Sequence, residues 1–93
     1  MIRSFRDRQT LRLWEGRADK AVPPHLREKA LSKLTSIDIA TEASELRVPP
    51  SNRLHKLSGD RDGQWAISID RQYRVCFYFD GDAHDVEVTD YHH

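Results

Sequence analysis

The sequence predicts an α+β fold, in which an N-terminal strand and helices pack on one face of a mainly antiparallel β-sheet. Apolar residues recur at helical spacing in the first half of the chain, whereas residues 53–93 hold consecutive alternating runs separated by short turns. Helices segregated in this way from consecutive strands are typical of α+β proteins. The length, 93 residues, is that of one small domain, so we expect residues 1–93 to form a single unit.

The N-terminal segment is expected to form a short strand and then a helix. Residues 2–5 alternate as a strand would, but only a completed sheet could hold so short an element. Asp7 can cap a helix that runs to about Glu15, with Gly16 as its stop. Four arginines surround this helix: Arg6, Arg8, Arg12 and Arg17. They could form a basic surface that binds RNA or binds an acidic protein segment. We favour the plainer interpretation, that they form a solvated helix face.

A second helix is expected from about His25 to Ile37. Two prolines precede it, and proline fits the first helical turn because its missing N–H is not needed there. Its apolar residues recur at spacings of four, four and three: Leu26, Ala30, Leu34 and Ile37. Such a stripe predicts that the helix covers one face of the sheet. Residues 48–52 then lead, as an extended connector, into the strands.

The strand-like runs predict an antiparallel meander. Residues 53–58 come first, residues 64–69 and 74–79 form a hairpin around a polar turn, and residues 84–91 follow. A period of two turns one set of side chains toward the core: Trp65, Ile67, Ile69, Val75, Phe77, Phe79, Val86 and Val88. The opposite face carries polar groups and is expected to stay open as the place where a ligand would bind.

The composition limits the class of protein. Lys and Arg number 15 and Asp and Glu number 15, so the molecule as a whole has no field that would draw it to nucleic acid. Residues 1–33 hold nine basic and four acidic residues, so an acidic partner could be met by one face. The single Cys76 excludes an internal disulfide and is expected to be a core or sheet residue. With no membrane-length apolar run and no signal-peptide pattern, we expect a soluble, intracellular protein.

Several polar and ionisable groups are candidates for a site on the open face: Lys56, Ser58, Arg61, Arg71, Arg74, Asp90, Tyr91 and His92. Cleavage of RNA needs groups of these kinds, namely a base for the 2′-hydroxyl, an acid for the leaving oxygen and cations for the phosphate. An aromatic ring can hold an unstacked base. No metal is required, and the histidines lack the spacing of a metal site. Plainer interpretations stay open, because terminal histidines are often solvated, Asp90 could simply pair with Arg74, and Tyr91 could simply pack.

Three stretches of the sequence together resemble the HigB toxins of the RelE/ParE superfamily: MIRSF, then KALSKLTSIDIATEASELRVPPSNRLHKLSGDRDGQWAISI, then YRVCFYF with VEVTDYH. The resemblance covers essentially the whole chain in order. It implies a RelE/ParE-like fold and the toxin of a type II toxin–antitoxin system. It further implies a metal-independent endoribonuclease, an mRNA interferase without cofactors, that cleaves mRNA on the ribosome and inhibits translation in the bacterial cytoplasm.

The same resemblance implies partners and residue roles. The partners would be the ribosome, mRNA and a HigA-like helix-turn-helix antitoxin, through which alone operator DNA would be reached; no membrane is implied. The ending Asp90-Tyr91-His92 is similar to the family's terminal catalytic motif, with His92 as the acid or base and its two neighbours assisting. Arg74 is similar to a phosphate-contacting arginine of the family.

Two departures from the family pattern keep alternatives open. A characterised kind of HigB has lysine where this chain has Ser58, for which Lys56 could substitute, and arginine where this chain has Asp70 followed by Arg71. One alternative is therefore a catalytically weakened homologue that still binds its antitoxin. The other is a ParE-like toxin that is not a nuclease and inhibits DNA gyrase, against which the terminal Asp-Tyr-His motif speaks.

Overall fold

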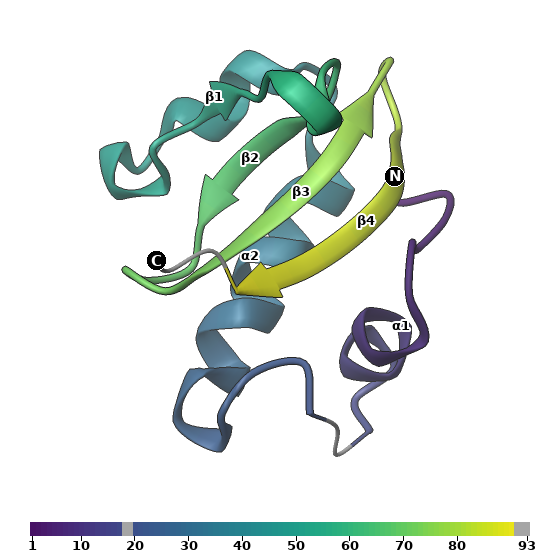
Figure 1. The fold of residues 1–93 in the computed structure, drawn as a ribbon, viewed down its shortest axis with the longest axis vertical. Coiled ribbons are helices and arrows are strands. Elements are labelled where there is room, and N and C mark those ends of the chain that lie inside the picture. The colour runs from purple at the N-terminus through teal and green to yellow at the C-terminus, as the bar shows by residue number, and fades with distance from the viewer. Residues whose placement is uncertain (18–19, 91–93) are drawn as a thin grey trace.

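The structure, a computed structural model, describes residues 1–17 and 20–90 (Figure 1). Its α-helices are α1 (Arg8–Trp14) and α2 (Arg27–Ile39), and its strands are β1 (His55–Lys56), β2 (Trp65–Ser68), β3 (Tyr73–Phe79) and β4 (Ala83–Asp90). The strands form one antiparallel sheet in the order β1-β2-β3-β4. This arrangement confirms the predicted α+β class.

The two helices follow the sequence signals with small shifts. The Asp7 cap is confirmed, since the backbone N–H of Thr10 donates to Asp7 Oδ1 at 2.8 Å. The second helix was predicted to begin at about His25. Pro24–Leu26 instead form a 3₁₀ turn, η1, and α2 begins at Arg27. Among the described residues, no helix has both the length and the apolar character needed to cross a membrane.

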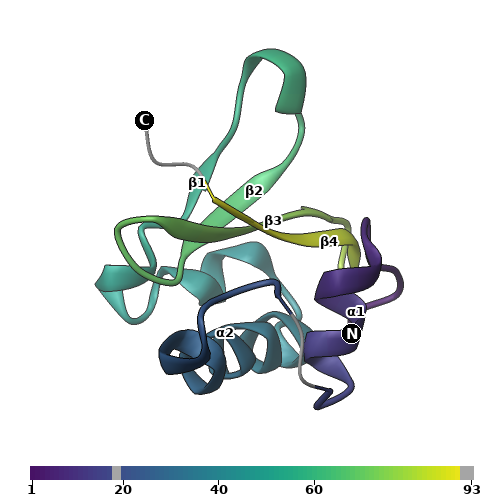
Figure 2. The ribbon, with the colours of Figure 1, turned by 60° about the horizontal axis from the view of Figure 1, so that its bottom comes forward.

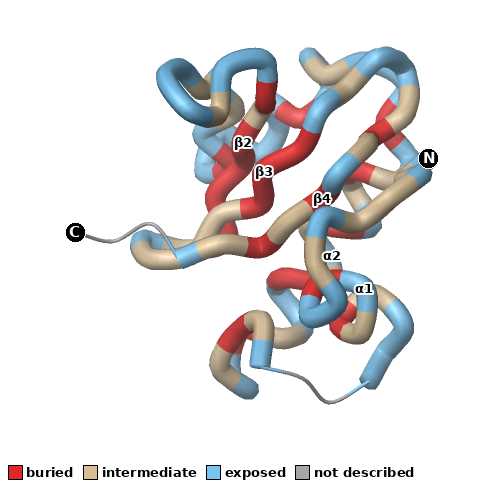
Figure 3. The backbone as a smooth tube through the Cα atoms, turned by 45° about the vertical axis from the view of Figure 1, so that its right-hand side comes forward, coloured by how far each residue is buried: buried red, intermediate tan, exposed pale blue. Residues whose placement is uncertain are grey.

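The core lies between α2 and one face of the sheet, and Figure 2 shows the helix beneath that face. The predicted stripe of α2 is buried in full: Leu26, Ala30, Leu34 and Ile37. It packs in one cluster with Ile67, Val75 and Phe77, and buried residues are concentrated along β2 and β3 in Figure 3. Each fully buried aliphatic or aromatic side chain contributes about 1.5–3 kcal/mol. Because the core occupies this face, a ligand site of the sheet must lie on the other face.

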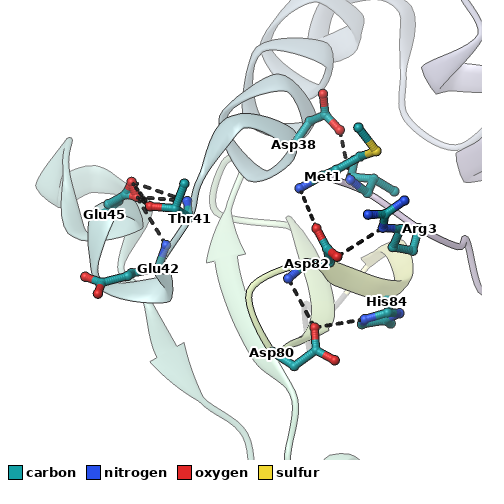
Figure 4. A network of polar contacts seen from close by, with 10 residues as sticks. Met1, Arg3, Asp38, Thr41, Glu42, Glu45, Asp80, Asp82 and His84 are labelled. Carbon is teal, nitrogen blue, oxygen red and sulfur yellow. Dashed lines mark hydrogen bonds and ion pairs between the residues drawn. The ribbon is translucent and has the colours of Figure 1, made fainter.

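The N-terminal segment runs beside β4 but forms only two isolated parallel bridges, Ile2 with Ala83 and Phe5 with Val86, and not the regular strand expected. Polar contacts fasten it at both sides (Figure 4). The Arg3 Nε donates to Asp82 Oδ2 at 3.0 Å, and the backbone N–H of Ile2 donates to an Asp38 carboxylate oxygen at 2.8 Å. The segment therefore covers part of the outer edge of β4.

Candidate functional site

The face of the sheet away from α2 carries Arg74 near the start of β3, an inner strand of the sheet. The register pairs Arg74 of β3 with Ser68 of β2 on one side and with Thr89 of β4 on the other, so these three side chains share that face. The neighbouring row runs across the same strands through Ala66, Cys76 and Glu87. The β2 residues beside Arg74 and Cys76 are therefore small, and both are buried: Ala66 fully, and Ser68 with 9% of its surface exposed.

The loop between β1 and β2 closes part of this face, which the sequence predicts to be open. In Figure 2 the loop rises on the side of the sheet away from α2. At its tip is a 3₁₀ turn, η4 (Gly59–Arg61), from which the Arg61 guanidinium donates to Glu87 Oε1 at 2.8 Å and to Gln64 Oε1 at 3.1 Å. The hydrogen bond to Glu87 raises the pKa of Arg61. Arg61 therefore has a partner across the sheet and braces the loop.

Cys76 lies on this face and is fully buried. Burial raises the pKa of its thiol, although the neighbouring guanidiniums of Arg74 and Arg61 act in the opposite direction. The thiol therefore stays protonated at neutral pH, as befits the sheet residue that the sequence predicts.

His55 is on the same face, and sequence reasoning did not single it out. It pairs with Ala66, which continues the row of Cys76 and Glu87 onto β1. Its Nδ1 lies 2.7 Å from the carbonyl oxygen of Arg53, and because a carbonyl only accepts, Nδ1 must carry the proton. The exposed imidazole then offers Nε2 as a proton acceptor. The signal that could have found it is the hairpin register across the turn at residues 59–63.

Lys56 and Ser58 are not brought onto this face, contrary to expectation. Lys56 pairs with Trp65, and its Nζ lies 5.1 Å from the centroid of the Trp65 ring. Trp65 in turn pairs with Phe77 of the core, so the alternation of β1 places Lys56 on the other side from Arg74. Ser58 lies outside the short strand, exposed, just before η4.

The turn between β2 and β3 holds Arg71 and contacts the end of β4 through Gln72. Asp70 Oδ1 accepts from the backbone N–H groups of Gln72 at 2.9 Å and Tyr73 at 2.7 Å, which fixes the turn. The Gln72 side-chain amide donates to Asp90 Oδ2 at 2.9 Å. Asp90 is exposed and pairs with Tyr73, one residue before Arg74, so its side chain leaves the strand on the opposite side.

Tyr91 and His92 lie outside the described residues. Within residues 1–17 and 20–90, no group of three His, Cys, Asp or Glu side chains could hold a metal ion. The described part of the site therefore consists of the Arg74 guanidinium, the Ser68 hydroxyl and the His55 imidazole on one sheet face. Arg71 in the β2–β3 turn and Asp90 at the end of β4 add a second cation and a carboxylate. These groups can bind a phosphodiester and transfer protons.

Comparison with known proteins identifies the family. The model of the HigB-like toxins, described as RelE-like toxins of the type II toxin–antitoxin system HigB, matches residues 3–92. "Endoribonuclease HigB" of Proteus vulgaris is 37% identical over 93 residues, covering 99% of this chain and 100% of the relative. "Toxin HigB-1" of Vibrio cholerae is 32% identical over 85 residues, covering 89% and 90%. With nearly its whole length matched and the expected α+β fold in place, this chain belongs to the HigB-like toxin family of type II toxin–antitoxin systems.

Proposed function

We propose that this toxin, as a single domain, is an endoribonuclease that cleaves mRNA on the ribosome and so inhibits translation. The observation that carries the proposal is the placement of Arg74 and His55 on one face of the sheet, with the small Ser68 and Ala66 between them. The printed name of the Proteus relative, an endoribonuclease, supports the same activity.

In the proposed mechanism, the side chains of the face act on the scissile phosphodiester without a metal ion. Arg74 binds the phosphate and offsets the charge that develops in the transition state. His55 Nε2 takes the proton from the attacking 2′-hydroxyl, and His92 gives a proton to the leaving 5′-oxygen. In-line attack by the 2′-hydroxyl then gives a 2′,3′-cyclic phosphate and a free 5′-hydroxyl. Asp90, at the end of β4, assists His92, and Tyr91 stacks on a base.

The other predicted phosphate ligands take secondary places in this proposal. Arg71, exposed in the turn, binds a phosphate beyond the scissile one. Arg61 is held by Glu87 and positions the loop that walls the site. Lys56 and Ser58 flank that loop and can contact RNA outside the reacting centre.

A type II toxin is neutralised by an antitoxin, and membership of the family implies such a partner. We propose that the partner is a HigA-like helix-turn-helix protein. Through it, and not directly, the toxin would reach operator DNA. Copurification of this chain with the product of the adjacent gene tests this part of the proposal.

A cell-free translation reaction with a reporter mRNA tests the nuclease. We expect fragments only when ribosomes are present, with 2′,3′-cyclic phosphate ends, whereas a metal-dependent cut would leave other ends. His55→Gln and Arg74→Gln should each lower the cleavage rate by about 10²-fold or more. Arg8→Gln, which removes a charge from exposed α1, should cleave as the wild type does.

The outcomes separate the alternatives. Full cleavage by both site variants would remove these residues from the mechanism. Intact mRNA together with arrested DNA replication in growing cells would favour the gyrase inhibitor. Intact mRNA, no growth arrest and retained antitoxin binding would favour the weakened homologue.

A further inference from the structure

A cationic cavity of about 330 Å³ lies outside the face described above, beside the end of β2 and between α2 and the 3₁₀ turn η3 (Pro50–Asn52). Four of the side chains that line it are cations: Lys29, Lys33, Arg53 and Arg71. Asp70 is the acidic residue among its lining. In a chain with a formal net charge of zero, this is a local excess of positive charge.

Two of the cations are held side by side on α2. Lys29 and Lys33 are four residues apart, so they face the same way, and like charges at this spacing repel each other. Partial burial, together with the charge of Lys29, lowers the pKa of Lys33. The Lys33 Nζ donates to the side-chain oxygen of Asn52, which is fully buried in η3. This acceptor is neutral, so it fixes the ammonium without cancelling its charge.

The other two cations, Arg53 and Arg71, come from the segment after η3 and from the β2–β3 turn. Arg53 has a left-handed backbone, with φ 50° and ψ 47°, which is uncommon for a residue other than glycine and turns the chain at the cavity. Within the described part of the chain, Lys29, Arg53 and Arg71 form no ion pair. The Asp70 carboxylate accepts two backbone N–H groups of the turn, so its charge is partly satisfied there.

The cavity is continuous with the face that carries Arg74. Ser68 lines the cavity and also pairs with Arg74 across the sheet. The residues of β1 pair with Trp65 and Ala66, and none of them pairs with Ser68. At Ser68, therefore, no strand separates the outer edge of β2 from the cavity. A chain of phosphates lying over Arg74 can therefore pass the end of β2 and reach Lys29 and Arg53.

We propose that this cavity is a second phosphate site for the RNA strand that is cleaved, binding a phosphodiester that lies beyond the scissile one. The inference rests on the proposed nuclease function and extends it to the path of the substrate. Repelling cations held close together on fixed elements are preorganised for an anion, which relieves their repulsion on binding. The volume is in the range of sites that hold small ligand groups.

The test measures binding of RNA strands of two lengths in which every 2′-hydroxyl is methylated, so that cleavage is impossible. One probe is a dinucleotide, which spans only the scissile phosphate, and the other is a single strand of about eight nucleotides. The variant Lys29→Gln/Arg53→Gln removes two cavity charges. The matched control Arg8→Gln/Arg47→Gln removes two exposed charges that do not line the cavity. Thermal unfolding checks that both variants fold.

The expected result is selective. The cavity variant should bind the longer strand more weakly, and the slope of log affinity against log salt should become shallower by about 0.7, the value for one lost phosphate contact on a single strand. Its affinity for the dinucleotide, and both affinities of the control, should stay at wild-type levels.

Three results would overturn the inference: equal binding of the longer strand by the cavity variant and the control, an equal loss for both probes, or no binding of the longer strand by the wild type. Loss of ribosome binding with unchanged strand binding would also overturn it, because the phosphate would then belong to ribosomal RNA. If the wild type cuts no mRNA but the cavity variant still loses strand binding selectively, the phosphate site stands and the nuclease function falls.

Discussion

The ion pair between Arg61 and Glu87 holds the β1–β2 loop over the sheet, and its removal should loosen that loop. Hydrogen bonds to charged groups contribute about 1.5–3 kcal/mol, whereas exposed ion pairs contribute about 0–1 kcal/mol. The side chains of Arg61 and Glu87 retain 28% and 17% of their exposure, so this pair lies between the two cases. We therefore expect a coupling free energy of about 1–2 kcal/mol.

A double-mutant cycle measures this coupling. The variant Glu87→Gln is isosteric, and Arg61→Met keeps an unbranched apolar stem without the guanidinium. The free energy of unfolding in urea is compared among the wild type, both single variants and the double variant. In a chain of this size, each kcal/mol lost should lower the melting temperature by about 4–8 °C. The Cys76 thiol, fully buried beneath this part of the face, should also react faster with a thiol reagent in Arg61→Met.

Arg6 supplies the matched control for this cycle. Its Nε lies 3.9 Å from the same Glu87 oxygen, and its side chain is 53% exposed, so Arg6→Met should couple to Glu87 by less than about 0.5 kcal/mol. If Arg61 couples to Glu87 no more strongly than Arg6 does, and if Cys76 reacts at the wild-type rate in Arg61→Met, then the ion pair does not hold the loop.

Four further predictions concern single positions. Gly63→Ala should lower the free energy of unfolding by about 1–2 kcal/mol and Gly59→Ala by less, because the φ of 67° at Gly59 lies in the left-handed region that L residues can adopt, whereas the φ of 93° at Gly63 lies outside it; equal losses in urea unfolding would contradict this. Asn52→Ala should lower it by about 2–4 kcal/mol, since the buried amide donates to two backbone carbonyls and accepts from a lysine; a loss below about 1 kcal/mol would count against this network. Hydrogen bonds from Arg3 and then from the N-terminal amine lower the pKa of Asp82. The stability that this carboxylate adds to the fold is therefore present above the ordinary carboxyl pKa of about 3.9 and is lost as the pH falls through the lowered value. Asp82→Asn should flatten the fall of stability in acid, and an unchanged pH profile would refute this. Asp70→Asn keeps an acceptor for the turn and should leave the melting temperature near that of the wild type while strengthening RNA binding, whereas Asp70→Ala should destabilise the protein by about 1 kcal/mol; equal melting temperatures for the two variants would contradict the capping role.

Local patterns were sufficient to predict most of the fold. The α2 stripe, the Asp7 cap and the core-facing residues of β2 and β3 depend on residues a few positions apart. These local patterns predict the structure correctly because the packing of the core agrees with them. The limits of β1 were not predictable in this way. Residues 53–58 are predicted to form one strand, yet Arg53 adopts a left-handed conformation and Ser58 leads into a 3₁₀ turn, so only His55–Lys56 pair.

The start of β4 shows why register is harder to predict than strand identity. Ala83 and Val86 are both fully buried although they are three residues apart, which strict alternation forbids. The pairing with β3 shifts between Cys76 and Tyr78, and Asp85 has a positive φ of 51°, so a β-bulge absorbs the extra residue. Without the bulge, Ala83 would face the same side as Glu87.

The site depends on contacts between distant parts of the chain, which no local pattern contains. The sequence marks Arg61 as a phosphate ligand, but the structure gives it a carboxylate partner 26 residues away. Lys56 was expected on the face of Arg74, and His55 was not singled out. One strand presents both, and only its pairing with Trp65 and Ala66 decides which of them shares that face.

The cationic cavity changes the meaning of the two departures from the HigB pattern. When the sequence is compared with the HigB pattern position by position, Ser58 and Asp70 stand where that pattern has cations. The comparison therefore predicts fewer cations around a phosphate and weak cleavage. Counted in space, Lys29 and Arg53 add two cations at the end of β2, close to Asp70 in the turn. An electrostatic contribution to phosphate binding depends on the distance of a charge from the phosphate and not on the element that supplies it. Positive charge missing from the turn can therefore be supplied by α2 and by the segment after η3.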